Sequence, residues 1–178
     1  MFAALRLLPL FALSFLSFQV RATQMWPLAV EELAQQADLI VHGTVTNKKC
    51  VQNPDGRIVT RVRLEVTEIW KGALATNSLT VVHGGGQIGH IHSEVSGQVE
   101  YSVGEEVVAF LVLNPRGEAV TIGLAQGKFH VWKDKATGEK FVHNIFHGVT
   151  EQAAARDERK AERLALKELS RRAKGGAR

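Results

Sequence analysis

The chain has 178 residues, 45% of them hydrophobic, and a formal net charge of +4. This length supports one domain with a buried core, and the composition is that of a globular protein without a low-complexity tract. The charge is uneven, because residues 23–150 hold 11 Lys and Arg against 13 Asp and Glu, whereas residues 151–178 hold 9 against 5. The body of the chain therefore gives no electrostatic basis for binding nucleic acid, and we expect no nucleic-acid partner.

Residues 1–22 have the pattern of a signal peptide. Arg6 precedes an apolar run over residues 7–18, and Val20-Arg21-Ala22 is typical of a cleavage site. The run is shorter than the roughly 20 apolar residues that a membrane-spanning helix needs. We expect cleavage after Ala22, export to the periplasm or the extracellular medium, and no membrane span in the mature chain.

Short strands separated by turns follow the signal sequence. A helix is expected over residues 26–37, and strands over residues 39–46, 58–70, 79–83, 107–113, 119–124, 128–133 and 141–145. Residues 87–101 have no clean period and are expected to form a loop with at most one short strand. The strand 58–70 alternates clearly until Glu68, where a slip in the pattern indicates a bulge or a bend. Residues 53–56 and 114–117 are strong turn signals.

The end of the chain is predicted to be helical over residues 150–173. Ala161, Leu164, Ala165 and Leu169 form a narrow apolar stripe among alternating charges. Because the stripe has few large side chains, we expect this helix to dock weakly. The predicted organisation is a signal peptide at 1–22, a β-barrel domain at 23–150, and a charged helix and tail at 151–178.

Together these elements predict a mainly β fold. Six or seven strands with a helix at each end favour a small antiparallel, OB-like barrel with a short N-terminal helix and a C-terminal helix. Cys50 is the only cysteine, so an internal disulfide is excluded. Barrel closure would protect the strand edges of such a chain.

Three stretches carry a resemblance to a known architecture. They are ADLIVHGTV at residues 37–45, the strand that ends in Trp70-Lys71-Gly72, and Gly104-Glu105-Glu106-Val107 with Phe110-Leu111. They resemble a group of uncharacterised exported bacterial domains whose strand order is similar to netrin-like modules, the OB-type barrel also seen in tissue inhibitors of metalloproteinases. The resemblance covers about residues 33–132 and implies that fold. Those inhibitors use an N-terminal cysteine and several disulfides, which this chain lacks, so the resemblance carries over no functional residue.

Histidines beside a glycine-rich stretch are the first candidate site. In an extended segment His90 and His92 point the same way, which is metal-ligand spacing on a strand. His83, on the far side of Gly84-Gly85-Gly86, is a candidate third ligand, and zinc is the metal that such a site would hold; apart from this alternative we expect no cofactor. The alternative is that the loop imidazoles are merely solvated.

A predicted hairpin supplies the second candidate, a pair of histidines. A four-residue turn after Asp134 places His130 opposite His143, where the two rings are able to share a metal or to act as a pH-sensitive pair. The same register places Asp134 opposite Glu139, which is a like-charge clash. A three-residue loop would instead put Val131 opposite His143, and the sequence leaves both registers open.

No assembled catalytic set appears in the sequence, because the adjacent Glu105 and Glu106 point to opposite faces of a strand. The sequence favours an exported, non-catalytic binding module that acts through its face or through the loop 84–101, with an unknown protein or envelope component as its partner. One alternative is a metal-dependent site or enzyme built on the loop histidines. Another is an envelope assembly protein that recruits a partner through its C-terminal helix.

Overall fold

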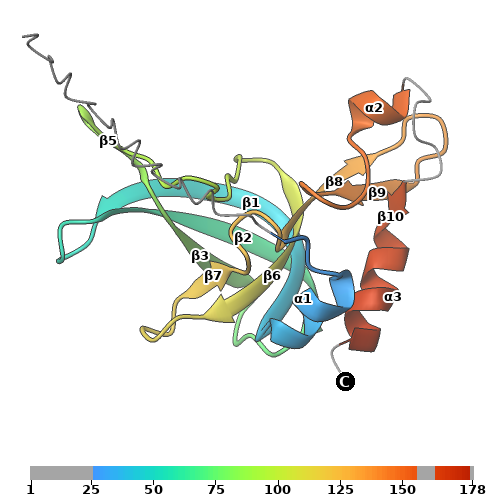
Figure 1. Cartoon of the computed structure of the whole chain (residues 1–178), viewed down its shortest axis with the longest axis horizontal. Helices are drawn as coiled ribbons and strands as arrows, with labels where there is room; N and C mark the ends of the chain where they lie inside the picture. The colour runs from blue at the N-terminus through green and yellow to red at the C-terminus, as the bar shows by residue number, and fades with distance from the viewer. Residues whose placement is uncertain (1–25, 156–162, 177–178) are drawn as a thin grey trace, which may run out of the picture.

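A computed structural model describes residues 26–155 and 163–176, so the predicted signal peptide lies outside the described residues. The fold is mainly β, with one large, mostly antiparallel sheet and a helix near each end of the described chain, which confirms the predicted fold class (Figure 1). The helices are α1 (Val30–Gln36), α2 (Glu151–Ala155) and α3 (Leu166–Gly176). The strands are β1 (Leu39–Gln52), β2 (Ile58–Lys71), β3 (Ser78–Gly84), β4 (Gly86–Ile88), β5 (Ile91–Ser93), β6 (Glu106–Leu113), β7 (Ala119–Thr121), β8 (Lys128–Lys133), β9 (Lys140–His143) and β10 (Leu164–Ala165). None of the described helices has the length and apolar character that a membrane crossing requires.

Five strands pair in a ring. β1 pairs with β2, β2 with β3, β3 with β7, β7 with β6, and β6 pairs back with β1. Four of these contacts are antiparallel, whereas β3 and β7 run parallel and share the single register pair Val81 with Ala119. At the contact between β3 and β7 the ring is therefore joined by a single residue pair. β8, β9 and β10 continue the sheet outward from β6.

Irregularities in the β1–β2 hairpin bend the sheet. The turn over residues 53–56 forms as predicted, because the Asn53 N–H donates to the Arg57 carbonyl and the Gly56 N–H donates to the Asn53 carbonyl. Further along, the register skips Thr67 and Trp70 on β2, which confirms the predicted bulge. At this bend a Cβ on Gly43 would overlap the Glu65 carbonyl oxygen, so glycine permits the close approach of the two strands.

The two large clusters of the hydrophobic core lie on opposite sides of this sheet, and Trp132 and Val149 form a third, small cluster. Val41, Val62 and Tyr101 belong to the cluster enclosed by the strand ring. Ile40 and Phe110 point the other way, into a cluster that the sheet shares with α1 and α3. Neighbouring residues of a strand face opposite sides of the sheet, so the apolar side chains of β1 contribute to both clusters.

The C-terminal segment differs from its prediction in two ways. A continuous helix over residues 150–173 is wrong, since α2 ends at Ala155, and Leu164 and Ala165 pair with β9 as a strand. Ala161 of the predicted stripe lies outside the described residues.

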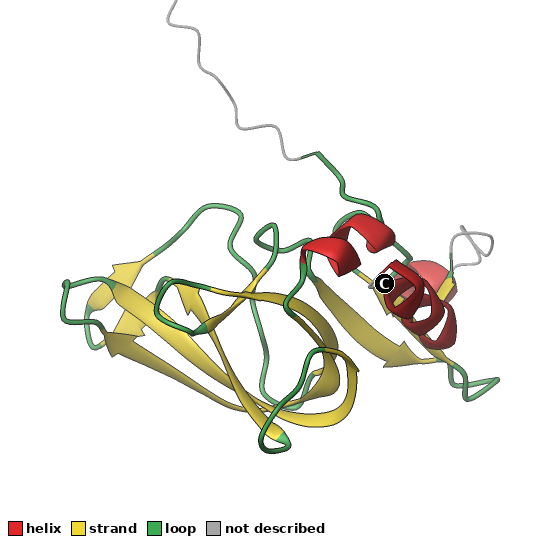
Figure 2. Cartoon of the chain, turned by 90° about the horizontal axis from the view of Figure 1, so that it is seen from below, coloured by secondary structure: helices red, strands yellow, loops and turns green. Residues whose placement is uncertain are grey.

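Weak docking of this segment is also wrong. Leu169 and Ala173, one turn apart on α3, are completely buried in the cluster shared with α1. Figure 2 shows the helices gathered at one end of the molecule. The small Ala173 side chain allows close approach, and Arg172 adds two hydrogen bonds, of 2.7 and 2.8 Å, to the Glu31 carboxylate of α1.

Candidate functional site

Two short strands stand apart from the large sheet. β4 and β5 pair only with each other and form a hairpin that projects from the ring of strands (Figure 1). The expectation of at most one short strand within residues 87–101 is therefore corrected. Gly86 has a φ of +134°, and a Cβ there would lie 2.6 Å from both Cys50 Sγ and Thr60 Oγ1. Glycine is thus required for the chain to cross β1 and β2 at this point.

A pocket with a volume of about 740 Å³ lies between this hairpin and the large sheet, and we call it the hairpin pocket. Its walls come from the β1–β2 turn, β3, the β5 segment and the turn before β7. The apolar side chains in its lining are Ile58, Val59, Val82, Ile91, Val95 and Val120. Ile91 and Val95 are 61% and 43% exposed, which is unusual for large apolar groups unless something covers them.

The charged side chains around the hairpin pocket are paired with one another. Asp55 accepts hydrogen bonds from Arg57 at 2.6 Å and from Arg116 at 3.2 Å. Glu118 accepts one from Arg61 at 2.9 Å. The Arg57 and Arg116 side chains nevertheless remain 72% and 54% exposed, so the rim presents positive charge to solvent.

His83 is the one buried ionisable side chain in the lining of the hairpin pocket. Its Nδ1 lies 2.9 Å from the Gly84 carbonyl oxygen, so Nδ1–H donates and Nε2 carries the lone pair. Nε2 is buried and has no hydrogen-bond partner among the described residues. Burial lowers the pKa of His83, which favours this neutral form.

Two of the three histidines of the predicted zinc site, His83 and His92, line one pocket, whereas His90 does not line it. His83 is buried, whereas His90 and His92 are exposed. Within the described ranges, no group of three or more His, Cys, Asp or Glu side chains has a metal-binding arrangement. The physical reason is the hairpin: Ile88 pairs with Ile91, so His90 lies in its turn and does not share a continuous strand with His92.

The other predicted histidine pair is assembled. The Asp134 N–H donates to the Glu139 carbonyl, which makes the four-residue turn, and His130 then lies opposite His143. The two imidazole centroids are 5.1 Å apart. The like charges of Asp134 and Glu139 are offset by ion pairs with Arg163 and Lys167.

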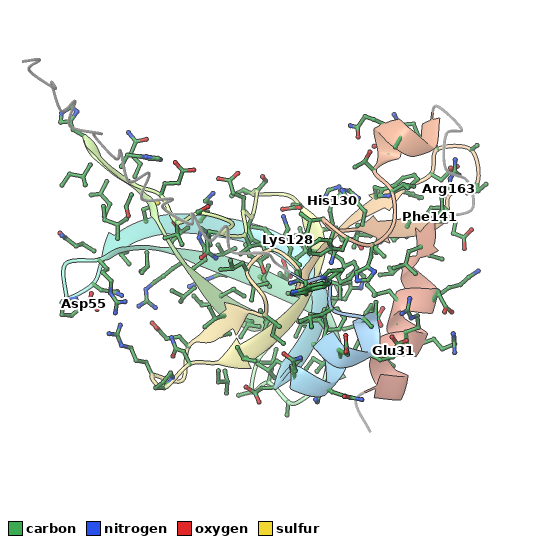
Figure 3. All side chains as sticks on the ribbon, in the orientation of Figure 1. Glu31, Asp55, Lys128, His130, Phe141 and Arg163 are labelled. Carbon is green, nitrogen blue, oxygen red and sulfur yellow. The ribbon has the colours of Figure 1, made fainter. Side chains whose placement is uncertain are left out.

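These histidines line a pocket of about 580 Å³, which we call the histidine pocket. Glu105 lies in it with only 10% of its side chain exposed, and binds His130 Nδ1 at 2.9 Å and Lys128 Nζ at 2.7 Å. Figure 3 labels Lys128 and His130 on β8, the strand that pairs with β6. Burial alone would raise the pKa of Glu105, but the hydrogen bonds from His130 and Lys128 lower it to about 2. Burial, with a smaller effect from His130, lowers the pKa of His143.

Sequence reasoning missed the role of Glu105 and Lys128. The carboxylates of Glu105 and Glu106 do point to opposite faces of the strand. Glu106 binds His42 at 2.6 Å and Lys140 at 2.7 Å, rather than Lys128 or His130. Lys128 and His130 are two residues apart on one strand and so share a face, which was the available signal. Nothing in the sequence indicated that the Glu105 carboxylate would contact Lys128 and His130.

Comparisons with known proteins give the chain no identity. No protein-family model matches it, and no curated protein matches it either. The resemblance to netrin-like modules therefore stays a prediction.

Proposed function

We propose that the chain is an exported, non-catalytic binding module that takes an apolar group of its partner into the hairpin pocket. The observation that carries this proposal is an apolar pocket of about 740 Å³ whose outer wall, Ile91 and Val95, is exposed. Ligand pockets are typically of this size and are lined mainly by apolar side chains with a few polar groups. The exposed arginines at the rim favour a partner group that is negatively charged beside its apolar part.

The polar groups around the hairpin pocket favour a binding role over a catalytic role. Asp55 and Glu118 are engaged by arginines, so neither carboxylate is placed as a free base. The His83 ring is buried and stacks on Tyr101, with 6.3 Å between the centroids, so it forms part of the wall of the pocket.

Export and the netrin-like relationship belong to the same proposal. The signal pattern at residues 1–22 and the absence of a second cysteine support an exported barrel that folds without disulfides. N-terminal sequencing of protein recovered from outside the cytoplasm is expected to begin at Thr23. Recovery of a cytoplasmic chain that retains residues 1–22 would contradict export.

The pocket is tested with an amphipathic anion, anilinonaphthalene sulfonate, whose fluorescence rises on transfer to an apolar site. We expect saturable binding to the native chain, with the affinity at least ten-fold weaker in the Ile91→Asp/Val95→Asp double variant. Both side chains are already exposed, so their replacement leaves the core intact. The lost apolar contacts and the added negative charge both weaken binding.

Val103→Asp is the matched control. Val103 is 63% exposed and does not line the hairpin pocket, so this variant is expected to bind the probe as the native chain does. Equal loss in Val103→Asp, or no loss in the double variant, would contradict the proposed site.

A further inference from the structure

The histidine pocket holds two imidazoles with unused nitrogens. His143 Nδ1 is buried and has no hydrogen-bond partner among the described residues. His130 donates its Nδ1–H to Glu105, which leaves its Nε2 lone pair without a partner in the described part of the chain. Each of the two rings, on neighbouring strands, thus has one nitrogen without a hydrogen-bond partner among the described residues.

The separation of the rings matches a shared ion. With metal–nitrogen bonds of about 2.0–2.1 Å, each imidazole centroid lies about 3.2 Å from the metal, so two rings at a tetrahedral angle stand about 5.2 Å apart. The observed centroid separation is 5.1 Å. The backbone register that sets this distance is the pairing of His130 with His143 across the β8–β9 hairpin.

Glu105 completes a recurrent arrangement. Metal-binding histidines generally donate their second ring N–H to a carboxylate, which fixes the tautomer and the ring orientation. Glu105 does this for His130 from a position at which only 10% of its side chain is exposed. The positive charge of Lys128 beside it is compensated by the same carboxylate at 2.7 Å.

From these contacts we propose that His130 and His143 bind one divalent transition-metal ion in the histidine pocket, with Glu105 as the positioning residue behind His130. Imidazole nitrogens suit copper, zinc and nickel, and copper binds such donors more tightly than zinc does. This site is separate from the hairpin pocket, and it uses neither His90 nor His92. Two protein ligands leave the remaining coordination positions open to water or to a small ligand.

The experiment titrates the purified chain, without a polyhistidine tag, with Cu²⁺ or Zn²⁺ alone. Calorimetry gives the stoichiometry and the affinity, and electron paramagnetic resonance of the copper form reports nitrogen ligands. We expect one equivalent of either metal, tighter for Cu²⁺, with nitrogen hyperfine structure. His130→Gln and His143→Gln are expected to weaken binding at least ten-fold, and Glu105→Gln by about 10–100-fold.

The His90→Ala/His92→Ala double variant is the control and is expected to bind metal as the native chain does. Circular dichroism checks that each variant is folded. If Glu105→Gln does not fold, the metal affinity of His143→Gln is the test of the proposed site. Unchanged affinity in folded His143→Gln, loss of binding in the His90/His92 variant, or no saturable binding of either metal would each overturn the proposal.

Discussion

Replacing Leu169 by alanine is expected to lower the free energy of unfolding by about 2–5 kcal/mol. Leu169 is completely buried between α3, α1 and the sheet, so truncation removes its apolar contacts and leaves a cavity. Because α3 closes one of the two core clusters, the loss should appear as a lower midpoint in urea with a single cooperative transition. Equilibrium urea unfolding followed by circular dichroism measures it.

Lys167→Ala is the matched control on the same helix. The Lys167 side chain is 82% exposed and its contact with Glu139 is a surface ion pair, so its removal should cost no more than about 1 kcal/mol. An equally small effect of Leu169→Ala would mean that α3 does not dock on the core.

Replacing Lys128 by methionine is expected to cost about 3–5 kcal/mol of stability, because it leaves the Glu105 carboxylate buried without its ammonium partner. Methionine keeps most of the apolar stem of the lysine side chain, so the charge is the main change. Lys140→Met is the control, since that ion pair with Glu106 is partly exposed and should cost about 1 kcal/mol or less. Equal losses in the two variants would contradict a special role for the buried pair.

The buried pair also predicts how stability depends on pH. The pKa of Glu105 is lowered to about 2 in the folded chain, so the unfolded state binds more protons at this carboxyl below its ordinary value of 4.5. The stabilisation is therefore complete above that value and is lost as the pH falls from about 4.5 towards 2. Urea midpoints measured across this range should fall more steeply for the native chain than for Lys128→Met.

Local patterns predicted most of the sheet. The strand 58–70 and the turn over residues 53–56 follow from clean alternation and from turn residues whose preferences are local. The bulge near Glu68 was visible as a slip in the same alternation. These features need no knowledge of distant contacts, and each is confirmed by the pairing of β1 with β2.

Features that depend on distant contacts could not be predicted in the same way. Leu164 and Ala165 fit the period of a helix, but they pair with β9, and that pairing overrides their propensity. The docking of α3 depends on α1, about 140 residues away in the chain, through contacts such as Arg172 with Glu31. Leu169 and Ala173 on its apolar face are consequently buried within this fold.

The candidate sites also differ in whether local sequence or distant contacts determine them. The pairing of His130 with His143 was one of two registers that a turn length could select, and the ion pairs around the turn explain why the clash did not exclude it. His90 and His92 do not share a strand, because a two-residue turn that includes His90 interrupts the extended segment that the sequence suggested. The walls of the hairpin pocket come from four separate segments of the chain, so no single stretch of sequence contains the pocket.

The most direct test of the proposed function is where an apolar anion binds. Two-dimensional amide NMR spectra, recorded during titration with anilinonaphthalene sulfonate, locate the site residue by residue. The account predicts saturable shift changes at residues 82–85, 91–95 and 114–120, which surround the hairpin pocket. Changes centred instead on residues 128–130 and 143–145, or no saturable change at all, would contradict it.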